Sequence, residues 1–263
     1  MADGTPVEQL PLGALSALAA EPTLLLHLAF LTKDKVAGMV ERDYVQGNRL
    51  ISATVLAHLR DIGADRVFMA SSGAAAFADD SVAAPDLRLY GRLKRDDEER
   101  LAAWARAEPA RRVAIGRLYA LSGPFINKPE SYALANLILS VLAGQPAQVR
   151  APMAVFRSYV AVREAMSLVV ALLLAAEGDP VCRFDTGGEP LELGQLAQTV
   201  ASVLGGQAMR PPPVEGQANR YLGDHQRWQE LLAEHGLQHS PIELQVAETA
   251  AWLKAVTRLG AEA

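Results

Sequence analysis

TLLLHLAFL, residues 23–31, gives the first indication of how this chain folds. It is apolar almost without interruption, so it shows neither the alternation of a half-buried strand nor the spacing of an amphipathic helix. A short run of this kind is typical of a strand that is buried on both faces, as in a parallel sheet. We therefore predict a buried strand here. Parallel strands also need crossover connections, so helices should follow it.

Strands and helices alternate in the rest of the sequence. Expected helices cover residues 10–20, 40–62, 91–108, 131–143, 160–176, 193–204, 224–235 and 242–258, and further expected strands cover residues 66–69, 113–119 and 183–185. This alternation predicts an α/β fold with a parallel sheet.

Composition excludes several classes of protein. The chain is 50% hydrophobic and 21% charged, which is typical of a globular protein with a real core. With a net charge of −5 and no run of Lys or Arg, we expect no nucleic-acid partner. No apolar run is long enough for a bilayer, so we expect no membrane association. The single cysteine, Cys182, and the lack of a signal peptide in residues 1–8 predict a cytoplasmic protein. We expect no metal site.

Tyr90 and Lys94 form the first candidate for chemistry. Four residues apart on a helix, they share one face. An ammonium beside a phenol lowers the phenol's pKa and makes proton exchange easier. Ser71 and Ser72 follow the strand at residues 66–69, at the edge where parallel sheets bind ligands. The alternative is a chance match, with a packed tyrosine and a surface lysine.

The order of motifs along the chain supports a functional role for Tyr90 and Lys94. The chain carries, in sequence, His27-Leu28-Ala29, Asn48, Ser71-Ser72, Tyr90 with Lys94, Arg157-Ser158-Tyr159-Val160, and Phe184-Asp185-Thr186-Gly187-Gly188. Over residues 23–258 this succession resembles the extended short-chain dehydrogenase/reductase family, the NAD-dependent epimerases and dehydratases of nucleotide sugars. The resemblance implies a Rossmann-like parallel sheet with a smaller C-terminal substrate-binding region.

Catalytic roles follow from the resemblance. Ser72 matches the family's hydroxyl donor and Tyr90 its acid/base. Lys94 matches the residue that supports the tyrosine and holds the nicotinamide ribose. Asn48 matches the asparagine that fixes the backbone near the lysine; an ordinary exposed helix asparagine is the alternative.

Binding roles follow in the same way. His27 and Ala29 match cofactor-binding positions, and Arg157 matches an arginine that meets the substrate's pyrophosphate. A core histidine and a surface ion pair are the alternatives for His27 and Arg157. The resemblance implies NAD or NADP as cofactor and a nucleotide sugar as substrate. It also implies a homodimer that packs through residues 40–62 and 91–108.

Departures from the family pattern limit these expectations. The sequence contains no GxxGxxG turn, the element whose backbone N–H groups bind a pyrophosphate. Only Gly4 and Gly13 precede the first strand. We therefore predict an N-terminally truncated sheet and poor dinucleotide binding. The chain is either a fragment or a natural truncation.

Two smaller departures concern the site itself. Gly73 and Ala74 follow Ser72 where family dehydratases carry an Asp-Glu pair, which disfavours sugar dehydration. Phe30 replaces a small residue after Ala29 and is expected to crowd the cofactor site.

Together these observations predict two regions and two possible functions. Residues 1–123 form a partial dinucleotide-binding region, and residues 124–263 are mainly substrate-binding, with residues 157–182 returning to the Rossmann core. The first function is an NAD(P)-dependent epimerase or keto-reductase of a nucleotide-linked sugar. The second is a catalytically silent, truncated relative that binds a partner chain or a sugar nucleotide.

Overall fold

A computed structural model of the chain describes residues 9–18, 20–21, 23–216 and 218–261. The chain divides into two compact units. Unit 1 comprises the residues up to Gly116 together with Leu173–Arg183, and unit 2 comprises Arg117–Leu172 and Phe184–Ala263. None of the described helices combines the length and the apolar character that crossing a membrane requires.

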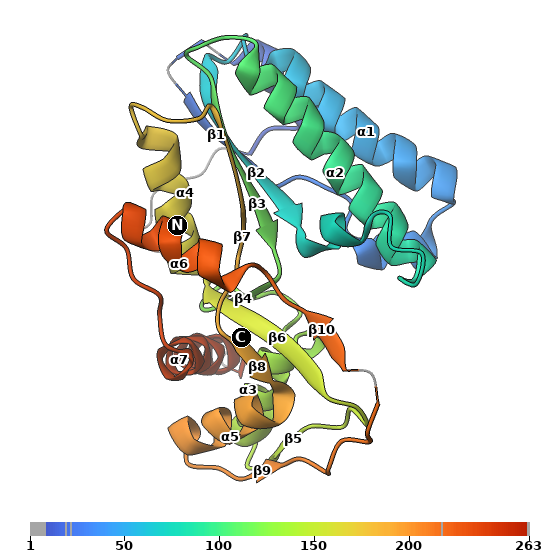
Figure 1. The fold of residues 1–263 in the computed structure, drawn as a ribbon, viewed down its shortest axis with the longest axis vertical. Coiled ribbons are helices and arrows are strands. Elements are labelled where there is room, and N and C mark those ends of the chain that lie inside the picture. Colours follow the sequence, from blue (N-terminus) through green and yellow to red (C-terminus); the bar gives the residue numbers. More distant parts are fainter. Residues whose placement is uncertain (1–8, 19, 22, 217, 262–263) are drawn as a thin grey trace. The chain divides into compact units, whose positions relative to one another are not determined.

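The sheet that begins in unit 1 has four strands in the order β1-β2-β3-β7 (Figure 1). Their bounds are β1 Thr23–His27, β2 Ala64–Ser72, β3 Arg112–Leu118 and β7 Val181–Asp185. β1 runs parallel to β2. Between successive strands of this order lie the helices α1, Glu41–His58, and α2, Pro85–Arg106. The prediction of an α/β fold with a Rossmann-like parallel sheet is confirmed.

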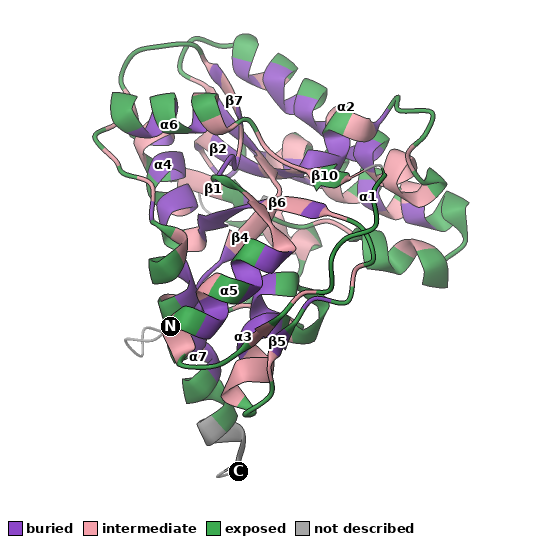
Figure 2. Cartoon of the chain, turned by 60° about the horizontal axis from the view of Figure 1, so that its bottom comes forward, coloured by how far each residue is buried: buried purple, intermediate pink, exposed green. Residues whose placement is uncertain are grey.

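An apolar core joins the helices of unit 1 to its strands. It contains buried residues of α1, β2, α2 and β3, among them Val55, Val67, Leu101 and Ile115. Buried and exposed residues follow one another along α2, because only one side of the helix meets the core (Figure 2). Short 3-10 helices complete the unit: η1 Leu12–Ala17, η2 Lys33–Gly38 and η3 Gly73–Phe77.

Two expectations for unit 1 were wrong in detail. The first strand ends at His27 rather than at residue 31, and Leu26 is 40% exposed instead of buried on both faces. The reason is that β1 is the last strand of its sheet among the described residues. Helix α2 begins at Pro85, not near residue 91, because a proline fits the first helical position. Tyr90 and Lys94 therefore lie within α2 rather than at its start.

Unit 2 contains a small mixed sheet. Strand β6 pairs in parallel with β4 and β10 and antiparallel with β8, and β5 pairs with β9. The bounds are β4 Ala120–Ser122, β5 Ala147–Gln148, β6 Val155–Ala161, β8 Pro190–Glu192, β9 Ala208–Met209 and β10 Asn219–Tyr221. We expected a helix from residue 160, but β6 continues to Ala161 and α4 begins only at Val162. The first residues of the apolar run belong to the strand.

Helices build the remainder of unit 2. Their bounds are η4 Pro129–Ser131, α3 Ala133–Leu142, α4 Val162–Leu174, α5 Leu193–Leu204, α6 His225–Glu234 and α7 Ile242–Ala261. α3, α5 and α7 pack around one apolar core that includes Ile138, Leu196 and Val246.

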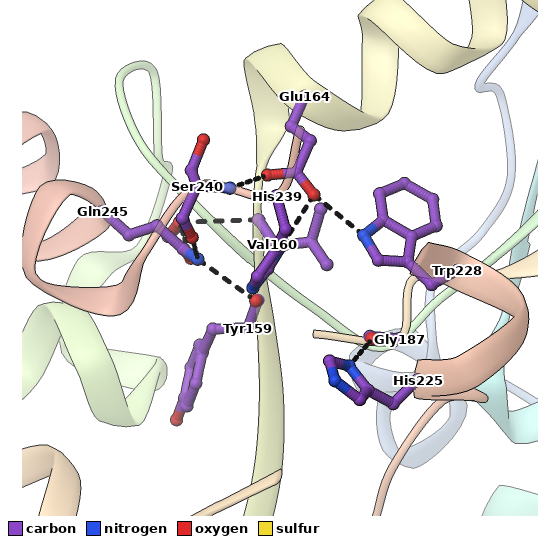
Figure 3. A network of polar contacts seen from close by, with 10 residues as sticks. Tyr159, Val160, Glu164, Gly187, His225, Trp228, His239, Ser240 and Gln245 are labelled. Carbon is purple, nitrogen blue, oxygen red and sulfur yellow. Dashed lines mark hydrogen bonds and ion pairs between the residues drawn. The ribbon is translucent and has the colours of Figure 1, made fainter. Parts of the chain in front are cut away.

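A buried carboxylate, Glu164, organises a second part of unit 2 (Figure 3). It accepts hydrogen bonds from Trp228 Nε1 at 2.8 Å and from the Ser240 backbone N–H at 2.7 Å. His239 Nδ1 lies 2.8 Å from the same carboxylate. Through these bonds one side chain joins α4 to α6 and to the segment that leads into α7. No local pattern in the sequence indicates this network.

Candidate functional site

The end of β2 in unit 1 presents two serines with different partners. Ser71 is buried, and its hydroxyl donates a hydrogen bond to the carboxylate of Glu98 on α2. Ser72 is half-buried and begins η3, where its Oγ accepts a hydrogen bond from the Ala74 N–H at 3.2 Å. Ser72 is therefore the more accessible hydroxyl at this edge of the sheet.

Gly91 explains why α2 comes so close to this edge. A Cβ at this position would lie 2.2 Å from the carbonyl oxygen of Ala74 in η3. Only a residue without a side chain permits that approach. Tyr90 precedes Gly91 directly and Lys94 follows one helical turn after Tyr90. Lys94 reaches the Ala70 carbonyl in β2 from this part of α2.

Lys94 is the most constrained member of the site. Its side chain is 4% exposed, and its Nζ donates a hydrogen bond to the Ala70 carbonyl at 2.7 Å. Burial lowers the pKa of Lys94 to about 8, although the nearby Asp97 and Glu98 carboxylates favour the charged form. An amine of this kind gains or loses its proton close to neutral pH.

Phe30 connects Lys94 with Tyr90. The ammonium of Lys94 lies 3.8 Å from the centroid of the Phe30 ring. The Tyr90 ring meets the same ring edge to face, with centroids 5.6 Å apart and an interplanar angle of 77°. The sequence analysis expected Phe30 to crowd the site, and the structure places its ring against both residues.

Asn48 is buried, so the interpretation as an exposed helix asparagine is wrong. Its Oδ1 accepts a hydrogen bond from the Leu31 N–H at 2.7 Å, and its Nδ2 donates to the Leu31 carbonyl at 3.4 Å. The Tyr44 hydroxyl donates to the same carbonyl at 2.8 Å. Asn48 and Tyr44 thus fix the main chain directly after Phe30.

The two expected cofactor positions on the first strand differ in exposure. His27 is 6% exposed, and burial together with the charge of Lys94 lowers its pKa to about 4, so the imidazole is neutral at neutral pH. This burial agrees with a core histidine. Ala29 is exposed, beyond the end of β1.

Two buried acids near Lys94, Asp97 and Glu98, were not identified from the sequence. Asp97 accepts a hydrogen bond from the Ser52 hydroxyl on α1, and burial raises its pKa in spite of that bond. Glu98 is fully buried. Both acids stand three and four residues after Lys94, a helical spacing that could have indicated a shared environment.

Arg157 belongs to unit 2, on β6. Its Nη1 donates to the Asn219 side-chain oxygen at 2.9 Å and to the Phe156 carbonyl at 2.7 Å. The guanidinium also lies 5.9 Å from the ring of Tyr221, and burial lowers its pKa. The structure therefore ties Arg157 to the neighbouring strand β10.

Unit 2 also contains two cavities. The larger, of about 440 Å³, has a polar lining that includes Asn136, Ser140, Gln148 and Arg150. The other, of about 390 Å³, is mostly apolar. Within the part of the chain that the structure describes, no group of three or more His, Cys, Asp or Glu side chains could hold a metal ion.

The sequence matches a known protein family. The model of the NAD dependent epimerase/dehydratase family matches residues 11–184. The chain therefore belongs to that family. Among curated proteins, none matches the sequence.

Solved structures show the same fold at low sequence identity. RMD from Pseudomonas aeruginosa, complexed with NADPH, is 20% identical with a TM-score of 0.71, covering 95% of this chain and 89% of its own. UDP-glucose 4-epimerase from Thermotoga maritima, with UDP-glucose, is 21% identical with a TM-score of 0.65, covering 88% and 77%. UDP-N-acetylglucosamine 4-epimerase from Methanobrevibacter ruminantium is 17% identical with a TM-score of 0.69, covering 92% and 79%.

Proposed function

We propose that this chain is an NAD(P)-dependent epimerase or keto-reductase of a nucleotide-linked sugar. The observation that supports the proposal is the contact of Lys94 with the Ala70 carbonyl of β2, the strand that ends at Ser72, together with the Phe30 ring that meets both Lys94 and Tyr90. The family membership and the complexes of its structural relatives with NADPH or UDP-glucose agree with it.

Proton transfer is the part of the reaction that falls to these residues. In this proposal Tyr90 exchanges a proton with a sugar hydroxyl or carbonyl oxygen, and Ser72 donates a hydrogen bond to the same oxygen. The ammonium of Lys94 stabilises negative charge on the phenol oxygen. Asn48 acts indirectly, by holding the main chain at Leu31.

The residues present fit the family's cofactor in their chemistry. An ammonium has three N–H donors, and the Ala70 carbonyl takes one of those of Lys94, so the amine can also bond to ribose hydroxyls. We propose that Lys94, with His27 and Ala29 on the adjacent strand segment, holds NAD or NADP. When bound, this cofactor supplies the hydride chemistry.

The substrate's nucleotide is assigned to unit 2. The cavity of about 440 Å³ is large enough for a nucleoside, and its amide and hydroxyl side chains can bond to a base. Arg157 is proposed to meet the pyrophosphate, since a guanidinium suits phosphate oxygens. We further propose a cytoplasmic homodimer. Within residues 40–62, the segment expected to form the interface, Val55 is buried in the core of unit 1.

A single variant tests the catalytic assignment. Purified chain is incubated with NAD or NADP and with UDP-glucose or UDP-N-acetylglucosamine, and products are separated by chromatography. Tyr90→Phe keeps the ring and removes the acid/base, so turnover should fall by roughly a hundredfold or more. Unchanged turnover in a folded variant would show that Tyr90 is not the acid/base.

The second candidate is a silent relative that binds a sugar nucleotide or a partner chain. One observation favours it: the Phe30 ring covers Lys94. Calorimetry separates the candidates. A silent relative should bind UDP-sugars but neither dinucleotide, whereas the enzyme should bind both kinds of ligand.

A further inference from the structure

The ring of Phe30 occupies the side of Lys94 that a ligand would need. Its centroid is 3.8 Å from Nζ, and its edge contact with Tyr90 brings the same ring against the second member of the pair. While the ring stays there, it covers part of Lys94 and part of Tyr90.

The contact between Lys94 and the Phe30 ring has a clear physical basis. The ammonium of Lys94 is almost fully buried, and a buried cation needs partners. The Ala70 carbonyl supplies one oxygen, and the π-face of Phe30 supplies a cation–π contact. A ring face is a weaker partner than an oxygen atom, so the hydroxyl of a ligand can replace it.

The main chain beside Phe30 is held firmly. Leu31 is bonded at both its N–H and its carbonyl by Asn48, and again at its carbonyl by Tyr44. A Cβ at Gly47 would lie 2.8 Å from the Leu31 side chain, so α1 also packs closely on this segment. Because the backbone is fixed, the ring can leave only by rotating its own side chain. Phe30 itself is half-buried, so part of its ring already meets solvent.

We propose that Phe30 is a gate: its ring stands in for a ligand hydroxyl on Lys94 and closes the Tyr90–Lys94 pair until a ligand displaces it. The identity of that ligand as the ribose of a dinucleotide rests on the proposed function. The gate itself is a property of the chain without ligand. Phe30→Ala therefore opens the site, and it does so whether or not the chain turns over a sugar.

Amine labelling of the intact protein tests the gate. The chain is treated briefly with an acetylating reagent at about pH 8, where the low pKa of Lys94 favours its reactive neutral form. Peptide mass spectrometry then compares Lys94 with the exposed Lys35 and Lys254 in the same molecule. In the wild type Lys94 should label more slowly than both references, and in Phe30→Ala its rate should rise roughly tenfold.

A matched control and a second variant complete the test. Phe156→Ala removes another cation–π ring, which lies 4.2 Å from Arg220 in unit 2, and should leave Lys94 labelling unchanged. If Phe30→Ala does not fold, as judged by circular dichroism, Phe30→Val removes the ring and most of its reach and should also speed labelling. Fast labelling of Lys94 in the wild type, or slow labelling in folded Phe30 variants, would overturn the gate.

NADH binding, followed by fluorescence, reports separately on the proposed function. Weak or absent binding by an open Phe30→Ala would count against the cofactor and not against the gate.

Discussion

Gly91 on α2 and Ala74 in η3 approach each other so closely that a Cβ on residue 91 would lie 2.2 Å from the Ala74 carbonyl oxygen. This approach fixes the distance between α2 and the end of β2, so both stability and the site depend on it. A backbone atom cannot move aside as a flexible side chain can.

Gly91→Ala should therefore destabilise the protein by roughly 1–3 kcal/mol, the usual cost of overpacking. Urea unfolding followed by circular dichroism measures the change. Gly38→Ala is the control, because a Cβ at Gly38 meets nothing within 4 Å. Equal stability of Gly91→Ala and the wild type would show that α2 can shift without cost.

The protonation of Lys94 should appear in the pH dependence of the proposed reaction. Its pKa is lowered to about 8, mainly by burial, so the ammonium that supports Tyr90 is lost as pH rises through that value. We expect kcat/KM to fall above about pH 8. Lys94→Arg should move this fall to higher pH, because an arginine keeps its charge there. Lys35→Arg, an exposed substitution, serves as the control and should leave the profile in place. A profile that is the same in Lys94→Arg would assign the fall to another group.

Glu164 should make unit 2 sensitive to acid. Burial raises the pKa of this carboxyl. Hydrogen bonds from His239, Ser240 and Trp228 lower the pKa by more than burial raises it, so the net shift is downward. A folded-state pKa below the ordinary value means that the stabilisation is present above the ordinary glutamate pKa of about 4.3 and is lost as pH falls through the folded-state value. Thermal unfolding followed at a series of pH values below neutral should show this loss.

Glu164→Gln should lower the free energy of unfolding near neutral pH by roughly 1–3 kcal/mol. The amide nitrogen of the new glutamine cannot accept a hydrogen bond, so a donor that Glu164 satisfies loses its acceptor. The variant should also lose part of the acid sensitivity. Glu248→Gln is the control, since its partner Arg163 is largely exposed and such pairs contribute little. An unchanged acid profile in Glu164→Gln would mean that other carboxyls dominate.

The sequence predicted those parts of the fold that depend on local pattern, since apolar runs located β1 and β2. The four-residue spacing identified Tyr90 and Lys94 as site candidates, and their role stays a prediction. Strands β4, β8 and β10 were missed because three residues carry too little pattern, and their pairing with β6 defines them.

Contacts between positions far apart in the sequence could not be predicted either. Ser71 and Glu98 are 27 residues apart, and Ser52 and Asp97 are 45 apart. Nothing in the local sequence pairs them. Phe30 was noticed as a large residue at a small position, but its contact with Lys94 joins the segment after β1 to α2, and no local pattern shows that. The Glu164 network depends likewise on the way α6 and α7 return to α4.

The exposed edge of β1 provides the last prediction. β1 pairs with β2, and within the described residues it ends the order of its sheet. Its outer N–H and C=O groups therefore face away from the sheet. The segment has neither a proline nor a charge between residues 23 and 31, and Leu26 and Leu28 are 40% and 61% exposed. An apolar edge of this kind can pair with a strand of another chain.

Hydrogen exchange can measure whether this edge is open. In a dilute monomeric sample, amides of residues 24–28 should exchange much faster than those of Val67 and Phe68 in β2, which has a strand on each side. Leu26→Lys should reduce self-association at high concentration, because a charge on an edge opposes pairing. Light scattering measures that association, and Leu50→Lys, on the exposed side of α1, is the control. Protection of β1 equal to that of β2 in the monomer would show that the edge is already satisfied, and Leu26→Lys should then change nothing.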